Sequence, residues 1–181
     1  MPGRRRPPMD KTYLRECFVY DEVTGDLVWR ERPRAHFRGG AGWHNFNRQF
    51  AGRPAGRKDE KGRKQVKLNG RSYKAARLIW AWHDGLMGEH QIDHIDGDPG
   101  NDRIDNLRLA TAAQNARNRN ASCRNSSGVR NVTWHAQSEK WWVRLTISGK
   151  TISLGLYKDL DTAKRIAAEK RRALFGDFAR A

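Results

Sequence analysis

The sequence predicts an α+β fold: a mixed N-terminal region, a strand–loop–strand–helix (ββα) unit, and a small three-stranded antiparallel sheet packed on one helix. The ββα unit is indicated by residues 91–118, where two short alternating segments flank a loop rich in Gly, Asp and Asn and lead into a capped helix. The sheet is indicated by residues 128–178, where apolar and polar side chains alternate over three segments before a segment of helical period. With 181 residues, the chain has room for one ordinary domain or two small ones.

The charge of the chain is strongly positive. It carries 36 Lys and Arg against 20 Asp and Glu, which gives a net charge of +16. Because such cations displace condensed counterions from phosphates, this excess indicates a polyanionic partner, most simply a nucleic acid. The alternatives are a solvated basic surface and packing against RNA in the manner of a ribosomal protein.

Cysteine usage and hydropathy exclude several classes of protein. Cys17 and Cys123 lie far apart without paired spacing, which disfavours a disulfide framework and a Cys-rich zinc site. No apolar run approaches the roughly 18 residues of a membrane span. No apolar segment follows the basic N-terminus as it would in a signal peptide. We therefore expect a cytoplasmic protein with no membrane partner.

The N-terminal elements are predicted mainly from turns and caps. Residues 1–9 form a basic, Pro-rich arm that we expect to be disordered until bound. A short helix is expected from Asp10, a turn at Thr24-Gly25 and a strand over residues 26–30. Residues 31–62 show no sustained period and are interpreted as loop with short strands.

Residues 65–85 predict a hairpin followed by a helix. Residues 65–68 alternate, and Asn69-Gly70 is a strong hairpin turn signal. Apolar side chains then recur at helical spacing until Gly85, namely Ala75, Ala76, Leu78, Ile79 and Trp82. We interpret this helix as core packing.

The central stretch, residues 91–118, carries five Asp residues in an otherwise basic chain. A strand over 91–95 and a second around 107–109 flank a loop, and a helix starts at Thr111, where Gln114 completes a capping box. An acidic loop inside a cationic shell suits a divalent metal held against a nucleic-acid backbone.

Four side chains of this stretch fit the hydrolysis of a phosphodiester bond. His94 suits a general base, because neutral imidazole accepts a proton near physiological pH. Asp93 and Asn115 are hard oxygen donors that suit Mg²⁺ or Mn²⁺ better than zinc. Asn106 could bond the loop backbone and hold His94 in place. Adjacent strand residues point to opposite faces, so a site that uses both Asp93 and His94 requires either that the strand bend or that the two residues straddle the helix edge. The alternative is a loop in which Asp and Asn make ordinary turns.

Residues 93–115, DHIDGDPGNDRIDNLRLATAAQN, resemble the HNH nuclease motif in the form found in phage and intron homing endonucleases. The resemblance implies that Asp93 and Asn115 bind one divalent metal, Mg²⁺ with Mn²⁺ as an alternative. It also implies that His94 is the general base and that Asn106 holds the ββα loop. The chain departs from the pattern at Ala76, where such relatives commonly carry His, and this departure bears on catalytic efficiency or folding. No Cys pairs flank the motif, so no zinc is expected.

Three antiparallel strands are expected over residues 129–135, 140–147 and 150–156, followed by a helix that Asp161 caps. One face of this sheet is apolar and meets the helix; it comprises Trp141, Val143, Leu145, Ile147, Ile152, Leu154 and Leu156. The other face displays Arg, Trp and hydroxyl side chains and needs another partner. A DNA groove is one such partner, and a protein is the alternative.

This C-terminal part, which begins GVRNVTWHAQSEKWWVRLTISGK, resembles the Apetala-2/ethylene-response-factor (AP2/ERF) DNA-binding domain. The resemblance implies a three-stranded sheet laid in the major groove with a helix behind it. We expect DNA contacts from the sheet, its turn, the preceding helix end and the basic linker: Arg130, Trp134, Trp142, Arg144, Thr146, Lys150, Ser153, Arg117, Arg119 and Arg124. Val132 stands where the plant domains usually have a second Arg, so the plant target sequence does not carry over.

Together these patterns predict a site-specific DNA endonuclease of the homing type, found in phage or other mobile elements, that nicks double-stranded DNA once per active site. The alternatives are a DNA-binding regulator with a decayed nuclease fold and a nuclease for RNA or branched DNA. The oligomeric state stays open, with a monomer as one option. The expected divisions are the arm 1–9, an N-terminal region 10–64, an HNH domain 65–118, a basic linker 119–127 and a DNA-binding domain 128–178.

Overall fold

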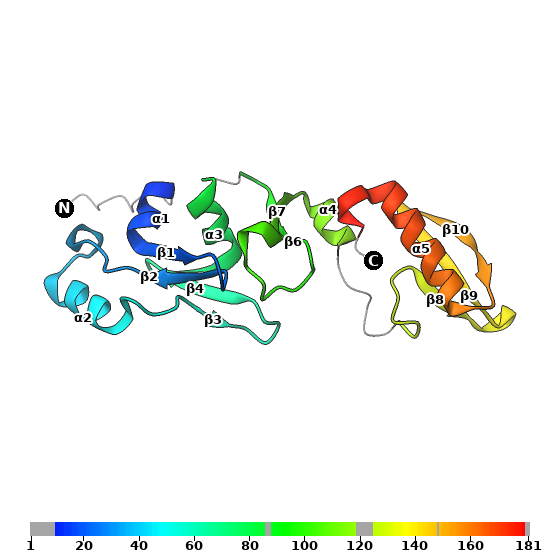
Figure 1. Ribbon diagram of the computed structural model, residues 1–181, viewed down its shortest axis with the longest axis horizontal. Coiled ribbons are helices and arrows are strands. Elements are labelled where there is room, and N and C mark those ends of the chain that lie inside the picture. Colours follow the sequence, from blue (N-terminus) through cyan, green and yellow to red (C-terminus); the bar gives the residue numbers. More distant parts are fainter. Residues whose placement is uncertain (1–9, 86–87, 119–124, 148, 180–181) are drawn as a thin grey trace. The chain divides into compact units, whose positions relative to one another are not determined.

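The fold is α+β, as the sequence predicts, and the chain divides into two compact units (Figure 1). The N-terminal unit comprises residues 1–111 and the C-terminal unit residues 112–181. Within the described residues all sheets are antiparallel, two with two strands and two with three. None of the helices in the described residues is long and apolar enough to cross a membrane.

The computed structural model describes residues 10–85, 88–118, 125–147 and 149–179. The expected N-terminal arm and residues 119–124 of the expected linker lie outside these ranges. Two of the expected DNA contacts, Arg119 and Arg124, therefore belong to the part of the chain that is not described.

The helix α1 (Lys11–Cys17) opens the N-terminal unit, and the Asp10 carboxylate caps it by accepting a hydrogen bond of 2.8 Å from a backbone N–H of the first turn. α1 runs directly into β1 (Phe18–Asp21), which pairs with β2 (Asp26–Trp29). Gly25 adopts φ +72° in the turn between the strands, a left-handed conformation that glycine reaches without strain. The helix, turn and strand predicted for this segment are confirmed.

Residues 31–62 contain more regular structure than the expected loop with short strands. They form the 3₁₀ turn η1 (Arg34–His36), the helix α2 (Gly40–Phe50) and the short strand β3 (Arg57–Lys58). Glycines at the start of α2 lower its helical propensity, and for this reason the sequence did not predict the helix. Phe46 and Phe50, one turn apart, pack against the core and hold the helix in place.

The predicted hairpin is formed by β4 (Lys64–Leu68) and β5 (Arg71–Lys74), and β3 lies on the other side of β4. Asn69 and Gly70 adopt φ of 51° and 78°, as a two-residue type I′ turn requires. The helix α3 (Ala75–His83) follows and packs against α1 (Figure 1).

One core serves the whole N-terminal unit. Its buried side chains come from α1 through β7 and include Leu14, Phe18, Leu27, Val66, Leu68, Leu78, Ile79 and Leu107. Residues before and after position 64 share this core, so the expected division at that point does not coincide with a break in packing.

The central stretch forms the hairpin β6 (Gln91–His94) and β7 (Leu107–Ala110), with the 3₁₀ turn η2 (Ile104–Asn106) leading into the second strand. The register pairs Asp93 with Arg108 and His94 with Leu107. The strand, loop and strand predicted from the sequence are confirmed.

The C-terminal unit begins with the helix α4 (Ala112–Arg117) and continues into a three-stranded sheet backed by a helix. The sheet comprises β8 (Val132–His135), β9 (Lys140–Ile147) and β10 (Lys150–Tyr157), in the order β10-β9-β8. The helix is α5 (Leu160–Phe175), and η3 (Ala136–Ser138) and η4 (Gly176–Phe178) are short 3₁₀ turns. The cap of α5 is Asp159 rather than the expected Asp161, since its carboxylate accepts a 2.7 Å hydrogen bond from the Thr162 N–H.

The expected distribution of side chains over the two faces of this sheet is wrong at two positions. A bulge between Ser153 and Gly155 shifts the alternation of β10 by one residue, so Leu156 pairs with Trp142 on the face away from α5 and is 41% exposed. In β8, Trp134 pairs with Trp141, whose side chain packs against the core beneath α5. Directly opposed residues of an antiparallel pair share a face, so Trp134 lies on the helix side.

Candidate active site and DNA-binding face

His94, at the end of β6, is held by a carboxylate from the loop that follows. Its Nε2 lies 2.9 Å from Oδ1 of Asp102. Asp102 is only 2% exposed, and its Oδ2 is buried with no hydrogen-bond partner among the described residues. Sequence reasoning missed Asp102, because its role depends on a contact across the loop rather than on a local pattern.

The loop itself is closed by Asn106. The side-chain oxygen of Asn106 accepts from the Asp96 N–H at 3.0 Å, and its amide donates to Asp96 Oδ1 at 2.9 Å and to the Asn101 carbonyl at 2.8 Å. These bonds join the two ends of the loop. Bonds from Asn106 to the loop backbone are what the sequence suggested.

Asp96 adds further bonds inside the loop. Its carboxylate accepts from the Asp98 N–H at 2.8 Å and from the Asn101 amide at 2.7 Å. Partial burial, the largest single influence, raises the pKa of Asp96, yet the hydrogen bonds from Asn101, Asp98 and Asn106 together bring that pKa below its ordinary value. Asp96 is therefore ionised at neutral pH and acts as an anchor for the loop.

The β1–β2 hairpin supports the same loop from outside. The Tyr20 hydroxyl accepts from the Ile104 N–H at 2.8 Å, and the Arg103 guanidinium donates to the Val23 carbonyl at 3.1 Å. A Cβ added at Gly25 would lie 2.6 Å from the backbone nitrogen of Arg103. The residues next to Asp102 are thus in contact with the hairpin.

Asp93 lies on the opposite face of the hairpin from His94, since the pairing is regular through both residues. Of the two arrangements that a shared site allows, a bend of β6 is therefore not seen. Asp93 is 4% exposed, and its Oδ2 accepts from Nε and a terminal nitrogen of Arg108 at 2.9 and 2.8 Å. His94 and Asn106 stand at the two ends of one loop, whose ends are joined by the hydrogen bonds of Asn106. Asp93 is instead paired with Arg108.

The donor atoms at the expected metal site suit a hard cation. Asp93 offers a carboxylate whose plane is fixed by Arg108, and Asn115 on α4 offers an amide oxygen; both are oxygen ligands of the kind that Mg²⁺ and Mn²⁺ prefer. α4, and with it Asn115, belongs to the C-terminal unit. Among the described residues there is no group of three or more His, Cys, Asp or Glu side chains able to hold a metal ion.

The end of α4 is fixed by two arginines of the C-terminal unit. Arg130 donates to the carbonyls of Ala116 and Arg117 at 2.8 and 3.1 Å, and the buried Arg171 donates to the Arg117 carbonyl at 3.0 Å. The Arg117 guanidinium lies 4.7 Å from the centre of the Phe175 ring. Arg130 and Arg117, both expected to contact DNA, are thus engaged in holding α4.

The face of the C-terminal sheet away from α5 carries most of the other expected DNA contacts. Arg144 stacks on Trp142 at 4.7 Å, and the Trp142 indole N–H donates to the Ser153 hydroxyl at 2.8 Å. Thr146 is hydrogen-bonded to Thr151 at 3.0 Å. Lys150 is exposed at the end of the same strands, but it pairs with Ile147 and so belongs to the other face. We call the surface defined by Trp142, Arg144, Thr146, Thr151 and Ser153 the outer sheet face.

His135 joins the outer sheet face, although sequence reasoning did not single it out. It pairs with Lys140, and its ring lies edge-on to Trp142 at 5.7 Å. Its Nδ1 is buried without a hydrogen-bond partner in the described part of the chain. The correct register of β8 would have indicated His135 in place of Trp134.

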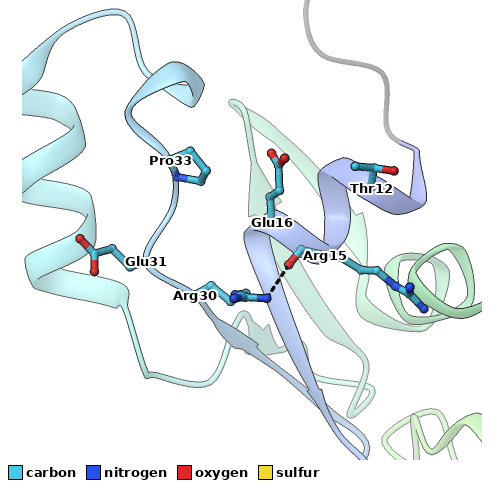
Figure 2. Close-up of a pocket in the computed structure, with 6 residues that line it drawn as sticks. All are labelled: Thr12, Arg15, Glu16, Arg30, Glu31 and Pro33. Carbon is cyan, nitrogen blue, oxygen red and sulfur yellow. Dashed lines mark hydrogen bonds between the residues drawn. The ribbon is translucent and has the colours of Figure 1, made fainter.

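A separate pocket of about 440 Å³ lies in the N-terminal unit beside α1 (Figure 2). Figure 2 shows Arg30 bonded to the Arg15 carbonyl, with Glu16 and Glu31 also on the wall. Its lining mixes both signs of charge and includes none of the predicted site residues, so it offers no preference for a polyanion.

Comparison with known proteins identifies the central stretch. A family profile described as HNH endonuclease matches residues 73–117, a range that contains Asp93, His94, Asn106 and Asn115. Protein 3.8 of Escherichia phage T7 is 36% identical over 114 residues, which cover 60% of this chain and 92% of that protein. No solved structure gives a significant match.

None of these comparisons supports the expected AP2/ERF resemblance. The profile match, together with a relative covered over nearly its whole length, shows that this chain belongs to the HNH endonuclease family.

Proposed function

We propose that this chain is a site-specific DNA endonuclease of the homing type, which hydrolyses one phosphodiester bond per active site with the help of a divalent metal. The observation that carries the proposal is the HNH match over residues 73–117, because these residues include the hairpin and loop that hold His94. The net charge of +16 favours a polyanionic substrate.

In this proposal His94 takes the proton from the attacking water. Donation of a hydrogen on Nε2 to the Asp102 carboxylate would make Nδ1 the basic nitrogen. Asp93, oriented by Arg108, and Asn115 are the protein ligands of one Mg²⁺, for which Mn²⁺ can substitute. When bound, the metal stabilises the negative charge that develops on the phosphate. Asn106 keeps the loop closed around His94.

The outer sheet face is the proposed reader of the target sequence. The stacking of Arg144 on Trp142 restricts the guanidinium before DNA binds, so binding costs less side-chain conformational entropy. Hydroxyls of Thr146 and Ser153 lie beside it and can bond base edges. The use of β-strands to read a DNA groove in other proteins supports this assignment.

The test is cleavage of supercoiled plasmid carrying phage or host DNA, with Mg²⁺ or with EDTA. Wild type should convert the plasmid to open circles only with Mg²⁺. His94→Ala should bind DNA in a gel shift yet cut about 10²- to 10⁴-fold more slowly, because the general base is gone. His44→Ala, which removes an exposed histidine of α2, is the matched control and should cut normally.

Each alternative gives a different result in this assay. Cleavage by His94→Ala at the wild-type rate would show that His94 is not the base. Wild type that shifts one DNA fragment but never cuts is the behaviour of a regulator with a decayed nuclease fold. Preferential cutting of RNA or of branched DNA over duplex DNA would indicate a structure-specific nuclease.

A further inference from the structure

We propose that Asp102 is a positioning residue for His94, and that the β1–β2 hairpin holds Asp102 in place. The inference rests on the proposed function, in which His94 is the general base. It assigns the N-terminal hairpin a part in the active site, in addition to its part in the core.

The contact itself fixes both the ring and its tautomer. An ionised carboxylate can only accept hydrogen bonds, so the 2.9 Å contact requires a hydrogen on Nε2 of His94. In the neutral ring the lone pair then lies on Nδ1. The same bond restricts rotation of the imidazole about its last side-chain torsion, so that Nδ1 keeps one direction.

The burial of Asp102 argues that the residue serves something other than stability. A carboxylate that is 2% exposed, with one oxygen lacking a hydrogen-bond partner among the described residues, is costly to bury. Buried polar atoms without partners are rare in folded proteins, and they concentrate where function requires them. The hydrogen bond to His94 is the interaction through which this carboxylate would serve the active site.

The hairpin constrains the backbone on which Asp102 is placed. Gly25 packs so tightly that an added Cβ would lie 2.9 Å from the Asp102 carbonyl carbon and 2.6 Å from the Arg103 nitrogen. Arg103 and Ile104 are bonded to Val23 and Tyr20 of the same hairpin. A side chain that must orient a catalytic group needs such support, because a shift of about 1 Å is enough to impair a designed or natural site.

The test compares Asp102→Asn with Asp105→Asn in the full-length protein. Asparagine matches aspartate in shape, so Asp102→Asn should fold, and it removes a buried charge. Asp105 lies in the same loop with its side chain 67% exposed, so its substitution controls for the loss of one negative charge. Unfolding temperatures and gel shifts establish that both variants fold and bind DNA.

The first readout is the tautomer of His94, measured by proton–nitrogen correlation spectra of protein with ring-labelled histidine. The chain has six histidines, and His94→Gln assigns the signal. Wild type should show protonated Nε2 and unprotonated Nδ1. Asp102→Asn should show a mixture, since an amide can either accept from or donate to the ring. Asp105→Asn should match wild type.

The second readout is the single-turnover cleavage rate on bound plasmid. Asp102→Asn should cut on the order of 10- to 100-fold more slowly, as is typical when a group that orients an active-site side chain is lost. Gly25→Ala should move in the same direction as Asp102→Asn in both readouts, because the added methyl group displaces residues 102 and 103.

The outcomes separate this inference from the proposed function. A wild type that cuts, with an Asp102→Asn variant that keeps the wild-type tautomer and rate, overturns the role of Asp102 alone. A wild type that does not cut any nucleic acid overturns the proposed function and, with it, the role of Asp102.

Discussion

Arg108 and Asp93 form a buried ion pair across the β6–β7 hairpin. The guanidinium donates twice to Oδ2 of Asp93, at 2.9 and 2.8 Å, and the two side chains are 15% and 4% exposed. The pair joins directly opposed residues of the two strands. Asp93 thus keeps a compensating charge in the folded protein, and its carboxylate has a fixed orientation.

Arg108→Met should destabilise the N-terminal unit by about 3–5 kcal/mol, because it leaves the Asp93 carboxylate buried without a cation. Chemical denaturation measures the loss. Asp105→Asn, which breaks an exposed pair with Arg103, should change the free energy of unfolding by no more than about 1 kcal/mol. Adding Asp93→Asn to Arg108→Met should recover part of the loss, since the uncompensated charge is then gone. Equal effects of Arg108→Met and Asp105→Asn would contradict the burial of the pair.

The elements that the sequence revealed are those with local signals. The Asn69-Gly70 turn needs only the ability of two residues to adopt positive φ, and α1 needs a capping carboxylate at Asp10. The hairpin around His94 was predictable because two alternating segments flank a loop rich in turn residues. In contrast, α2 begins with glycines and is held by tertiary packing of Phe46 and Phe50, which no local propensity reports.

Features that depend on register or on distant contacts were not predictable. One bulge in β10 is enough to transfer Leu156 to the other face of the sheet. The position of Trp134 depends on its pairing with Trp141, which the alternation of β8 alone does not fix. Asp102 gains its significance from a hydrogen bond to His94 across the loop and from packing against Gly25, two contacts that exist only in the folded chain.

Metal removal should abolish cleavage without abolishing DNA binding. EDTA is expected to stop cutting, and added Mg²⁺ or Mn²⁺ is expected to restore it, because the proposed metal ligands, Asp93 and Asn115, offer hard oxygen atoms. Asn115→Ala should raise the Mg²⁺ concentration that half-maximal cutting requires, whereas the gel shift should be unchanged. Full cutting in EDTA, or restoration by Zn²⁺ alone, would be inconsistent with this ligand set.

The acid stability of the C-terminal unit should depend on Asp159. Hydrogen bonds from the backbone and side chain of Thr162 hold the pKa of Asp159 below its ordinary value. A carboxyl group whose pKa is lower in the folded than in the unfolded state adds stability at neutral pH, and this contribution is lost as the pH falls through about 4 and below.

Asp159→Asn should therefore flatten the decline in unfolding temperature on the acid side while leaving the neutral value nearly unchanged, because Asn caps helices about as well as Asp. Asp161→Asn is the control from the same turn, and it should leave the acid decline in place. A steeper acid decline in Asp159→Asn would refute the assignment of Asp159 as the cap.

The two faces of the C-terminal sheet should respond differently to the same substitution. Trp142→Ala removes the ring on which Arg144 stacks and the donor to Ser153, both on the outer sheet face. It should weaken binding of the cognate fragment by roughly 1–3 kcal/mol, the loss expected when one base-reading arginine is no longer placed.

Trp134→Ala is the matched control, because its ring is 45% exposed on the side of the sheet that faces α5. Its effect on DNA affinity should be small, although both tryptophans belong to one sheet and neighbouring strands.

Titration of labelled duplex at several salt concentrations measures both variants. Loss of a phosphate contact lowers the slope of log affinity against log salt by about 0.9, so an unchanged slope for Trp142→Ala would indicate base rather than backbone recognition. A larger loss for Trp134→Ala than for Trp142→Ala would place the DNA on the other face and overturn the proposed mode of target binding.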